Sequence, residues 1–268
     1  MRRVRQFAWL LLAVVVLASL AAPWWAPADY AMQFRETPNS PPSHQHLLGT
    51  DELGRDRFSR VLYGTRVSLL MAPAAALLST LLATLVGGIA GYLGGWWERA
   101  AMGATDLFLS MPWLFLLLAV RAMLPLNVAP ITSVAVTFLL LGLLGWAASA
   151  RVLCAGVRGL RDSDFVLQAR ASGLRRLRLL AIHVMPNLKP VLMAQFWISI
   201  PVFIISEANL GILGLGVSEP LPSWGSLLRE LESFTSSGFE AWKLAPLALL
   251  VLVVSSFQII LSREEVYA

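Results

Sequence analysis

The sequence contains little charge and almost no cysteine for its length. Only 14% of its 268 residues are charged and 57% are apolar, whereas soluble domains average about 25% charged residues. A disordered chain is excluded, because so much apolar surface must be buried in a core or a bilayer. The single cysteine, Cys154, excludes a scaffold held by internal disulfides. The composition therefore predicts a membrane protein.

Apolar runs of membrane-spanning length fill most of the chain. A helix needs about 20 apolar residues to cross the hydrocarbon core. Six runs meet this requirement, although proline interrupts the second run at Pro73, the third at Pro112 and the fifth at Pro201. We expect an all-α integral membrane protein with six transmembrane helices, over residues 7–26, 67–93, 104–124, 131–150, 191–216 and 244–261.

The first run has two interpretations. Three arginines precede it, as they precede the apolar part of a cleaved signal peptide. However, Pro23 follows the small residues at which cleavage would occur, and the run continues into Trp24 and Trp25. Tryptophan is enriched where a helix meets the membrane surface. These features favour a retained span.

Basic residues determine the expected orientation. Residues 151–189 contain eight basic and two acidic residues, a net charge of +6. Cytoplasmic loops of membrane proteins carry an excess of Lys and Arg, so we place this loop and both termini in the cytoplasm. A basic loop between membrane spans does not favour nucleic-acid binding.

Small residues and charges suggest two further features. Gly87, Gly91 and Gly95 are spaced four apart, and small residues at this spacing allow membrane helices to approach closely. In the basic loop, residues 162–164 (DSD) are expected to cap a helix, and residues 169–173 have small side chains beside an arginine. This texture fits either a docking element for another protein or an amphipathic helix on anionic lipid.

The basic loop resembles the EAA loop of the permeases of ABC importers. The matching stretches are residues 165–173 (FVLQARASG) and residues 183–187 (HVMPN). The form is similar to that of the dipeptide/oligopeptide/nickel permease family, in particular its second permease subunit. Two other stretches agree with that family in order and spacing: residues 46–66, which include HLLGTDELGRD and YGTR, and residues 213–225, which include LGLG and PSWG.

The resemblance implies a type I importer permease fold with a cytoplasmic coupling helix. It divides the chain into residues 1–64, with the first helix and an outer segment, the permease domain over 65–262, and a tail over 263–268. It also implies a location in the bacterial cytoplasmic membrane. The implied partners are a second homologous permease, two cytoplasmic ATPase subunits and an extracytoplasmic solute-binding protein.

The resemblance assigns no catalytic residue or metal to this chain. ATP and Mg²⁺ would be held by the ATPase subunits, and the chain indeed lacks the GxxxxGK[ST] phosphate-binding loop. Residues expected to couple the permease to the ATPase lie in the EAA-like loop. Gln168 occupies the position that is acidic in the family, and Met185 stands where leucine is usual. The expected coupling residues are Gln168, Ala169, Arg170, Ala171, Gly173, His183 and Pro186.

Ionisable residues near the spans complete the expectations. Glu207 lies within the fifth run, where an acid is a functional candidate by default, with a role in gating, structure or the pore. Asp106 and Arg121 are expected to reach the membrane surfaces by snorkelling. The rival function is a secondary transporter driven by an ion gradient. Such folds usually show inverted repeats with broken helices and midplane ion ligands, whereas this sequence shows no repeat and Glu207 is its only midplane acid.

Two short polar motifs lie in the segment after the first run. His44 and His46 are too few for a metal site, which needs three or four ligands. Residues 55–57 (RDR) are expected to form a salt-bridged junction before the second span.

Overall fold

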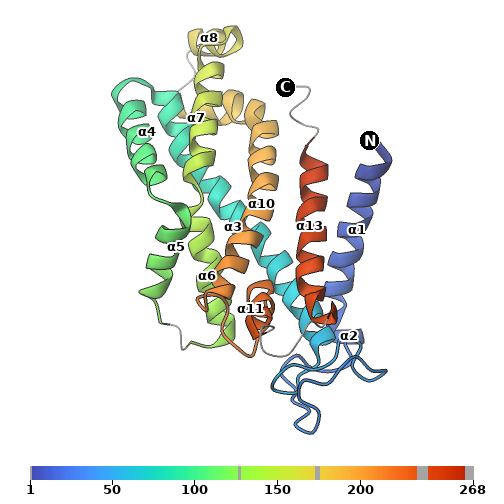
Figure 1. The fold of residues 1–268 in the computed structure, drawn as a ribbon. Coiled ribbons are helices and arrows are strands. Elements are labelled where there is room, and N and C mark those ends of the chain that lie inside the picture. The colour runs from blue at the N-terminus through green and yellow to red at the C-terminus, as the bar shows by residue number, and fades with distance from the viewer. Residues whose placement is uncertain (1, 126–127, 173–175, 234–240, 263–268) are drawn as a thin grey trace. The chain divides into compact units, whose positions relative to one another are not determined.

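The computed structural model describes residues 2–125, 128–172, 176–233 and 241–262, and over these residues it contains helices and no strand. The expected all-α membrane architecture is thus confirmed (Figure 1). In chain order the helices are α1 (Arg2–Leu20), α2 (Ala22–Trp25), α3 (Arg57–Leu93), α4 (Gly95–Ser110), α5 (Trp113–Ala122), α6 (Pro130–Leu144), α7 (Ala147–Arg161), α8 (Asp164–Ala171), α9 (Arg176–Leu179), α10 (Lys189–Ile212), α11 (Trp224–Arg229) and α13 (Ala245–Leu261).

The described residues contain five helical stretches that are long and apolar enough to span a membrane, and a bent pair supplies a sixth. The second span differs from expectation, because α3 continues through Pro73 and begins at Arg57. A proline removes one backbone hydrogen bond, a loss that membrane helices tolerate when neighbouring groups compensate. The expectation that Pro73 breaks the span was therefore wrong.

The third span is broken where the sequence contains Pro112. Helices α4 and α5 meet there at 81°. Met111, the residue before the proline, has extended backbone angles (φ −78°, ψ 132°), because the proline ring disfavours helical angles at the preceding residue. The expected continuous run over 104–124 is thus two helices, and the first begins at Gly95.

Contacts divide the chain into two compact units. The first contains Met1–Ala72, Val120–Phe138 and Pro201–Ala268, and the second contains Pro73–Ala119 and Leu139–Ile200. Two of the boundaries fall at the prolines within α3 and α10, Pro73 and Pro201.

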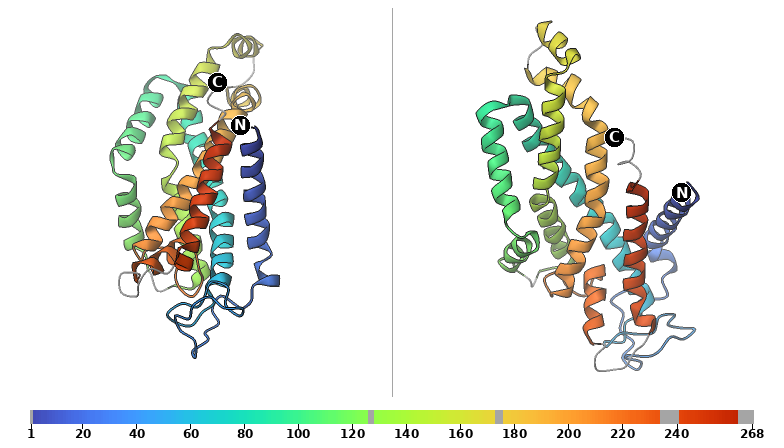
Figure 2. Two further views of the ribbon diagram at one scale, coloured as in Figure 1. Left: turned by 45° about the vertical axis from the view of Figure 1, so that its right-hand side comes forward. Right: turned by 45° about the horizontal axis from the view of Figure 1, so that its top comes forward.

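The first unit is built around α13 and the buried side chain of Trp224. Helix α1 packs along α13, and the two lie side by side in Figures 1 and 2. The indole of Trp224, on α11, is fully buried and donates a hydrogen bond from Nε1 to Thr65 Oγ1 at 3.1 Å. The backbone N–H of Trp224 donates to Ser68 Oγ at 3.3 Å. These bonds attach α11 to the first turns of α3.

The second unit depends on a close contact between α3 and α7. A Cβ atom built on Gly87 would lie 2.2 Å from the carbonyl oxygen of Ala150, and one on Gly91 would lie 2.5 Å from that of Cys154. Only glycine fits at such distances. The expected packing role is therefore confirmed for these two residues, but Gly95 has no neighbour within 4 Å of its built Cβ and was assigned wrongly.

The contact between α3 and α7 predicts that alanine is tolerated at some glycines and not at others. We expect Gly87→Ala to force α3 and α7 apart and to destabilise the protein by about 1–3 kcal/mol, as overpacking does. Gly103→Ala on α4 is the matched control, because a Cβ there meets open space and alanine favours a helix. Thermal unfolding of both variants in detergent measures the difference, and equal midpoints would contradict the packing assignment.

Candidate functional site

The basic loop forms a short helix anchored by one apolar side chain. Helix α8 follows α7 and buries Val166, which is 1% exposed. Val166 packs in a cluster with Val157 of α7 and with Leu179, Val184 and Leu188. Most other side chains of α8 are exposed and are not covered by any other part of the described chain.

The expected coupling residues occupy two places in this loop. Gln168, Arg170 and Ala171 are exposed on α8, while Ala169 is half-buried against the cluster. His183 and Pro186 lie instead in the turns Leu180–Val184 and Pro186–Leu188, whose residues Val184 and Leu188 pack beneath Val166. Gly173 lies outside the described residues. The structure thus brings the two halves of the EAA-like motif onto one small core.

The start of α8 differs in detail from the expected cap. Ser163 is the N-cap residue, but its hydroxyl donates back to the carbonyl of Leu160 at 2.5 Å. Its backbone carbonyl accepts the N–H groups of Val166 and Leu167, both at 3.0 Å. The side-chain cap predicted from the DSD motif is therefore absent, and the hydroxyl closes the preceding helix instead.

Ion pairs fix the helix that carries α8. Arg158 Nη1 lies 3.1 Å from Glu98 Oε1 of α4, and Arg161 Nη1 donates to the carbonyl of Gly91 on α3 at 3.2 Å. Arg161 also pairs with Asp162 at 3.2 Å, and this hydrogen bond lowers the pKa of Asp162 below its ordinary value. The end of α7 is thereby tied to both neighbouring helices.

Glu207 is fully buried in α10 within the first unit. Its Oε2 accepts hydrogen bonds from Ser68 Oγ at 3.3 Å and from the N–H of Gly225 at 3.4 Å, whereas Oε1 has no hydrogen-bond partner among the described residues. One turn later, a Cβ on Gly211 would lie 2.2 Å from the Cα of Gly225. Glu207 therefore joins three helices, α3, α10 and α11, where two of their backbones nearly touch.

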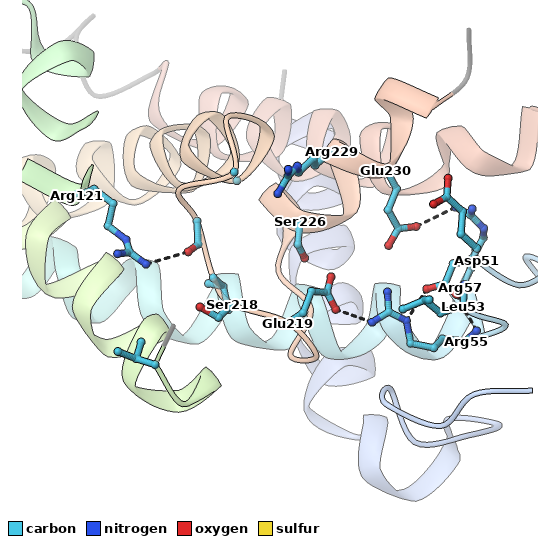
Figure 3. Close-up of a pocket in the computed structure, with 16 residues that line it drawn as sticks. Asp51, Leu53, Arg55, Arg57, Arg121, Ser218, Glu219, Ser226, Arg229 and Glu230 are labelled. Carbon is cyan, nitrogen blue, oxygen red and sulfur yellow. Dashed lines mark hydrogen bonds and ion pairs between the residues drawn. The ribbon is translucent and has the colours of Figure 1, made fainter. Parts of the chain in front are cut away.

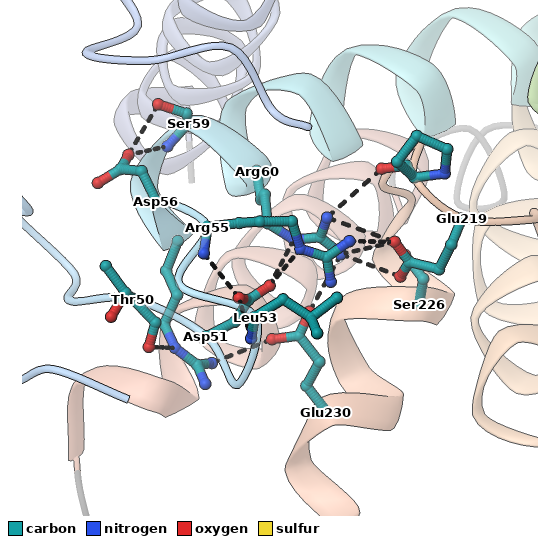
Figure 4. A network of polar contacts seen from close by, with 12 residues as sticks. Thr50, Asp51, Leu53, Arg55, Asp56, Ser59, Arg60, Glu219, Ser226 and Glu230 are labelled. Atoms are coloured by element: carbon teal, nitrogen blue, oxygen red, sulfur yellow. Dashed lines mark hydrogen bonds and ion pairs between the residues drawn. The ribbon is translucent and has the colours of Figure 1, made fainter. Parts of the chain in front are cut away.

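A buried ion-pair network holds the polar segment, residues 28–56, which precedes α3 (Figure 4). Asp51 Oδ2 lies 2.6 Å from Arg55 Nε, and Asp51 Oδ1 accepts the N–H groups of Leu53 and Arg55. Arg55 Nη1 lies 2.5 Å from Glu219 Oε2. Arg57 pairs with Glu230 at 3.1 Å. The salt-bridged junction predicted at residues 55–57 is confirmed.

The centre of this network was not apparent from the sequence. Arg60, which is fully buried, lies 3.1 Å from both Glu219 and Glu230. Both acids lie more than 150 positions later in the chain. No local motif pairs charges so far apart, and the acids close in sequence, Asp51, Glu52 and Asp56, give no sign that Arg60 pairs with distant ones.

The surroundings in this network shift the pKa values of Arg55 and Glu230. Burial lowers the pKa of Arg55, but the charge of Glu219 and the hydrogen bond to Asp51 raise it by more, so that it lies above its ordinary value. Burial raises the pKa of Glu230 against the opposing charges of Arg60 and Arg57. Glu230 is thus the carboxyl group whose ionisation the buried setting disfavours.

The remaining ionisable residues divide between surface and interior. Asp106 is exposed and pairs with Arg151 at 3.2 Å. Arg121 is fully buried, so its expected snorkelling was wrong, and it lines a cavity in the first unit (Figure 3). His46 Nδ1 lies 2.9 Å from Asp56 Oδ1. Within the described ranges, His, Cys, Asp and Glu form no cluster of three that could hold a metal ion.

Comparison with known proteins finds similarity over most of the chain. The model of the family described as "Binding-protein-dependent transport system inner membrane component" matches residues 83–263. The oligopeptide transport system permease protein OppC of Bacillus subtilis is 30% identical over 253 residues, which cover 94% of this chain and 80% of the relative. The di/tripeptide transport system permease protein DppC of Pseudomonas aeruginosa is 34% identical, with 92% and 81% covered.

The ion-pair network predicts a large effect from one charge. Asp51 Oδ2 lies 2.6 Å from Arg55 Nε and 3.6 Å from Arg60 Nε. We therefore expect Asp51→Asn to destabilise the polar segment by about 3 kcal/mol, because it leaves both arginines buried without this partner. Glu52→Gln is the matched control, since Glu52 is exposed and adjacent in sequence. Limited proteolysis of the polar segment and thermal unfolding measure both variants. Equal protection in the two would show that Asp51 does not hold the network.

The position of Glu207 predicts that an amide can replace it in folding. Glu207→Gln keeps a carbonyl oxygen for Ser68 and Gly225, whereas Glu207→Ala leaves both donors unpaired and is expected to cost about 1–3 kcal/mol. Thermal unfolding compares the two variants with the parent protein. If Gln is as destabilising as Ala, the negative charge itself is required for folding.

Proposed function

We propose a peptide as the solute of this chain, which belongs to the family of binding-protein-dependent transport system inner membrane components and is a multi-pass permease subunit of an ABC importer. The relatives described above are named for oligopeptides and for di- and tripeptides. Their similarity extends over nine-tenths of the chain, and this similarity is what supports a peptide here.

The partners we propose supply what this chain does not. ATP would be bound and hydrolysed by two cytoplasmic ATPase subunits, since the sequence contains no phosphate-binding loop of the GxxxxGK[ST] type. A second homologous permease would complete the translocation pathway, and an extracytoplasmic binding protein would deliver the solute. Both termini and the basic loop would then face the cytoplasm, in keeping with the +6 charge of that loop.

The exposed side chains of α8 are the main support for its role in coupling. Phe165 and Leu167 are 40% and 47% exposed, beside the small side chain of Ala171 and the charge of Arg170. Apolar side chains next to a small residue favour close contact with another surface. We place that surface on an ATPase subunit, which α8 would enter as the coupling helix.

The ion pairs around α7 explain how movement of α8 would be transmitted. Arg158 and Arg161 tie α7 to α4 and α3, and the glycine contacts hold α3 against α7 without intervening side chains. A rigid group of helices moves as one body rather than deforming. Closure of the ATPase pair would therefore shift the second unit as a whole between two states of the pathway.

A substitution on α8 tests this function. We expect Ala171→Arg to reduce both peptide uptake and peptide-stimulated ATPase activity at least tenfold, because a long side chain prevents close approach of α8 to its partner. Membrane insertion and the unfolding midpoint should be unchanged. Ala100→Arg, at an exposed position of α4, is the matched control and should retain both activities.

The same assay distinguishes the rival function. Uptake of a labelled tripeptide by cells is compared with and without the partner ATPases. Uptake that persists without them would show transport driven by an ion gradient and would overturn the ATP-driven assignment. Full coupling in Ala171→Arg, with ATP dependence intact, would instead refute only the role of α8.

A further inference from the structure

A polar cavity of about 740 Å³ lies within the first unit. Its walls come from the polar segment, the end of α5, the end of α10 with the loop that follows it, and α11 (Figure 3). Sites for small ligands usually measure roughly 300–1,000 Å³ and contain a few convergent polar groups. The cavity is thus of a size that holds a small peptide.

Arg121 is a buried cation with only neutral partners in this cavity. Its side chain is fully buried, and Nη2 donates to the carbonyl of Gly216 and to Ser133 Oγ, both at 3.3 Å. Nη1 donates to the carbonyl of Pro125 at 3.5 Å. Among the described residues, its Nε has no hydrogen-bond partner and no carboxylate lies within salt-bridge distance of it. An uncompensated buried charge is costly, so this guanidinium calls for an anion.

A second arginine lies at another wall of the same cavity. Arg229 ends α11 and rests over Gly214, where a built Cβ would lie 3.1 Å from its Nη1. It is exposed and forms no ion pair with another described residue. In the view of Figure 3, Ser218 lies below Arg121 and Glu219 lies below Arg229. The other arginines of the cavity, Arg55 and Arg57, are already paired with acids.

We infer that Arg121 is the centre of a binding subsite for a carboxylate, with Arg229 adding positive charge from another wall of the cavity, and that this carboxylate is the carboxyl terminus of a peptide in transit. Guanidinium groups bind carboxylates with charge-assisted, often bidentate hydrogen bonds. Glu52, which is exposed and lines the same cavity, provides negative charge for the peptide's amino terminus. The inference rests on the proposed function, because it requires a peptide to reach this cavity.

A carboxylate could reach Arg121 from the binding protein as well as from a peptide, and the experiment must distinguish the two. An acidic side chain of the binding protein would also satisfy Arg121 while the two proteins are in contact. A free peptide differs from it in one testable respect, since amidation of the peptide's carboxyl terminus removes the charge and leaves the binding protein unchanged.

Direct labelling of the assembled importer tests the subsite. The purified complex in nanodiscs, without binding protein, is irradiated with a tripeptide that carries a diazirine side chain, and unlabelled trialanine or its carboxyl-terminal amide competes. We expect trialanine to compete at least tenfold better than the amide, which corresponds to about 1.4 kcal/mol or more. Labelled residues should lie in the walls of the cavity.

Variants make the assignment specific to the two arginines. Arg121→Gln and Arg229→Gln should each lower labelling about tenfold, and Arg121→Lys should retain part of it because the charge remains. Arg229 is exposed, so its variant keeps the test valid if Arg121→Gln does not fold. Arg99→Gln, at an exposed position of α4, is the matched control and should label like the parent complex.

Each remaining outcome overturns the inference. Equal competition by the amide, or unchanged labelling in both arginine variants, refutes a carboxylate subsite. Absent labelling, together with weaker association of the binding protein in Arg121→Gln, assigns the carboxylate to the binding protein and refutes the peptide. ATP-dependent peptide uptake by the parent importer is measured separately. The failures described above therefore leave the proposed function intact, which only an absence of that uptake would refute.

Discussion

Hydrocarbon neither donates nor accepts hydrogen bonds, and the helices of membrane-spanning length in this protein are arranged around that constraint. In the membrane, the N–H and C=O groups of the backbone need hydrogen-bond partners within their own segment, and an α-helix provides them. Apolar side chains gain little by leaving lipid for another helix, so attraction must come from close packing. Gly87 and Gly91 supply it, because their missing side chains bring the backbones of α3 and α7 into contact.

The polar segment solves the opposite problem. Residues 28–56 form no helix, so their backbone groups find partners in turns, such as the N–H of Phe34 that donates to the carbonyl of Gly54 at 2.9 Å. A segment of this kind has little apolar core of its own. Its stability comes instead from arginines that are buried and paired with Glu219, in the loop after α10, and with Glu230, which follows α11. The polar segment and the part of the first unit around α11 therefore depend on one another.

The two candidate functional regions use charge in different ways. Around α7, the arginines form ion pairs with acids, which makes the helices one rigid group. The apolar and small residues of α8 are exposed and available to a partner. In the cavity, Arg55 and Arg57 are also paired with acids, whereas the described partners of Arg121 are all neutral. Rigid transmission needs satisfied charges, whereas binding of a charged ligand needs one that is not yet satisfied.

The fold class, the approximate membrane helices, the family and the basic loop that carries α8 could all be predicted from the sequence. These features follow from composition, from runs of about 20 apolar residues and from contiguous motifs, all of which are local in the chain. The sequence could not determine whether a proline breaks a helix, since a helix ends just before Pro112 whereas α3 continues through Pro73, and the difference depends on what surrounds each backbone. Nor could it pair Arg60 with Glu219 and Glu230, or bury Arg121. Those outcomes join residues that are far apart in the chain, and only tertiary packing decides which charges are withdrawn from water together.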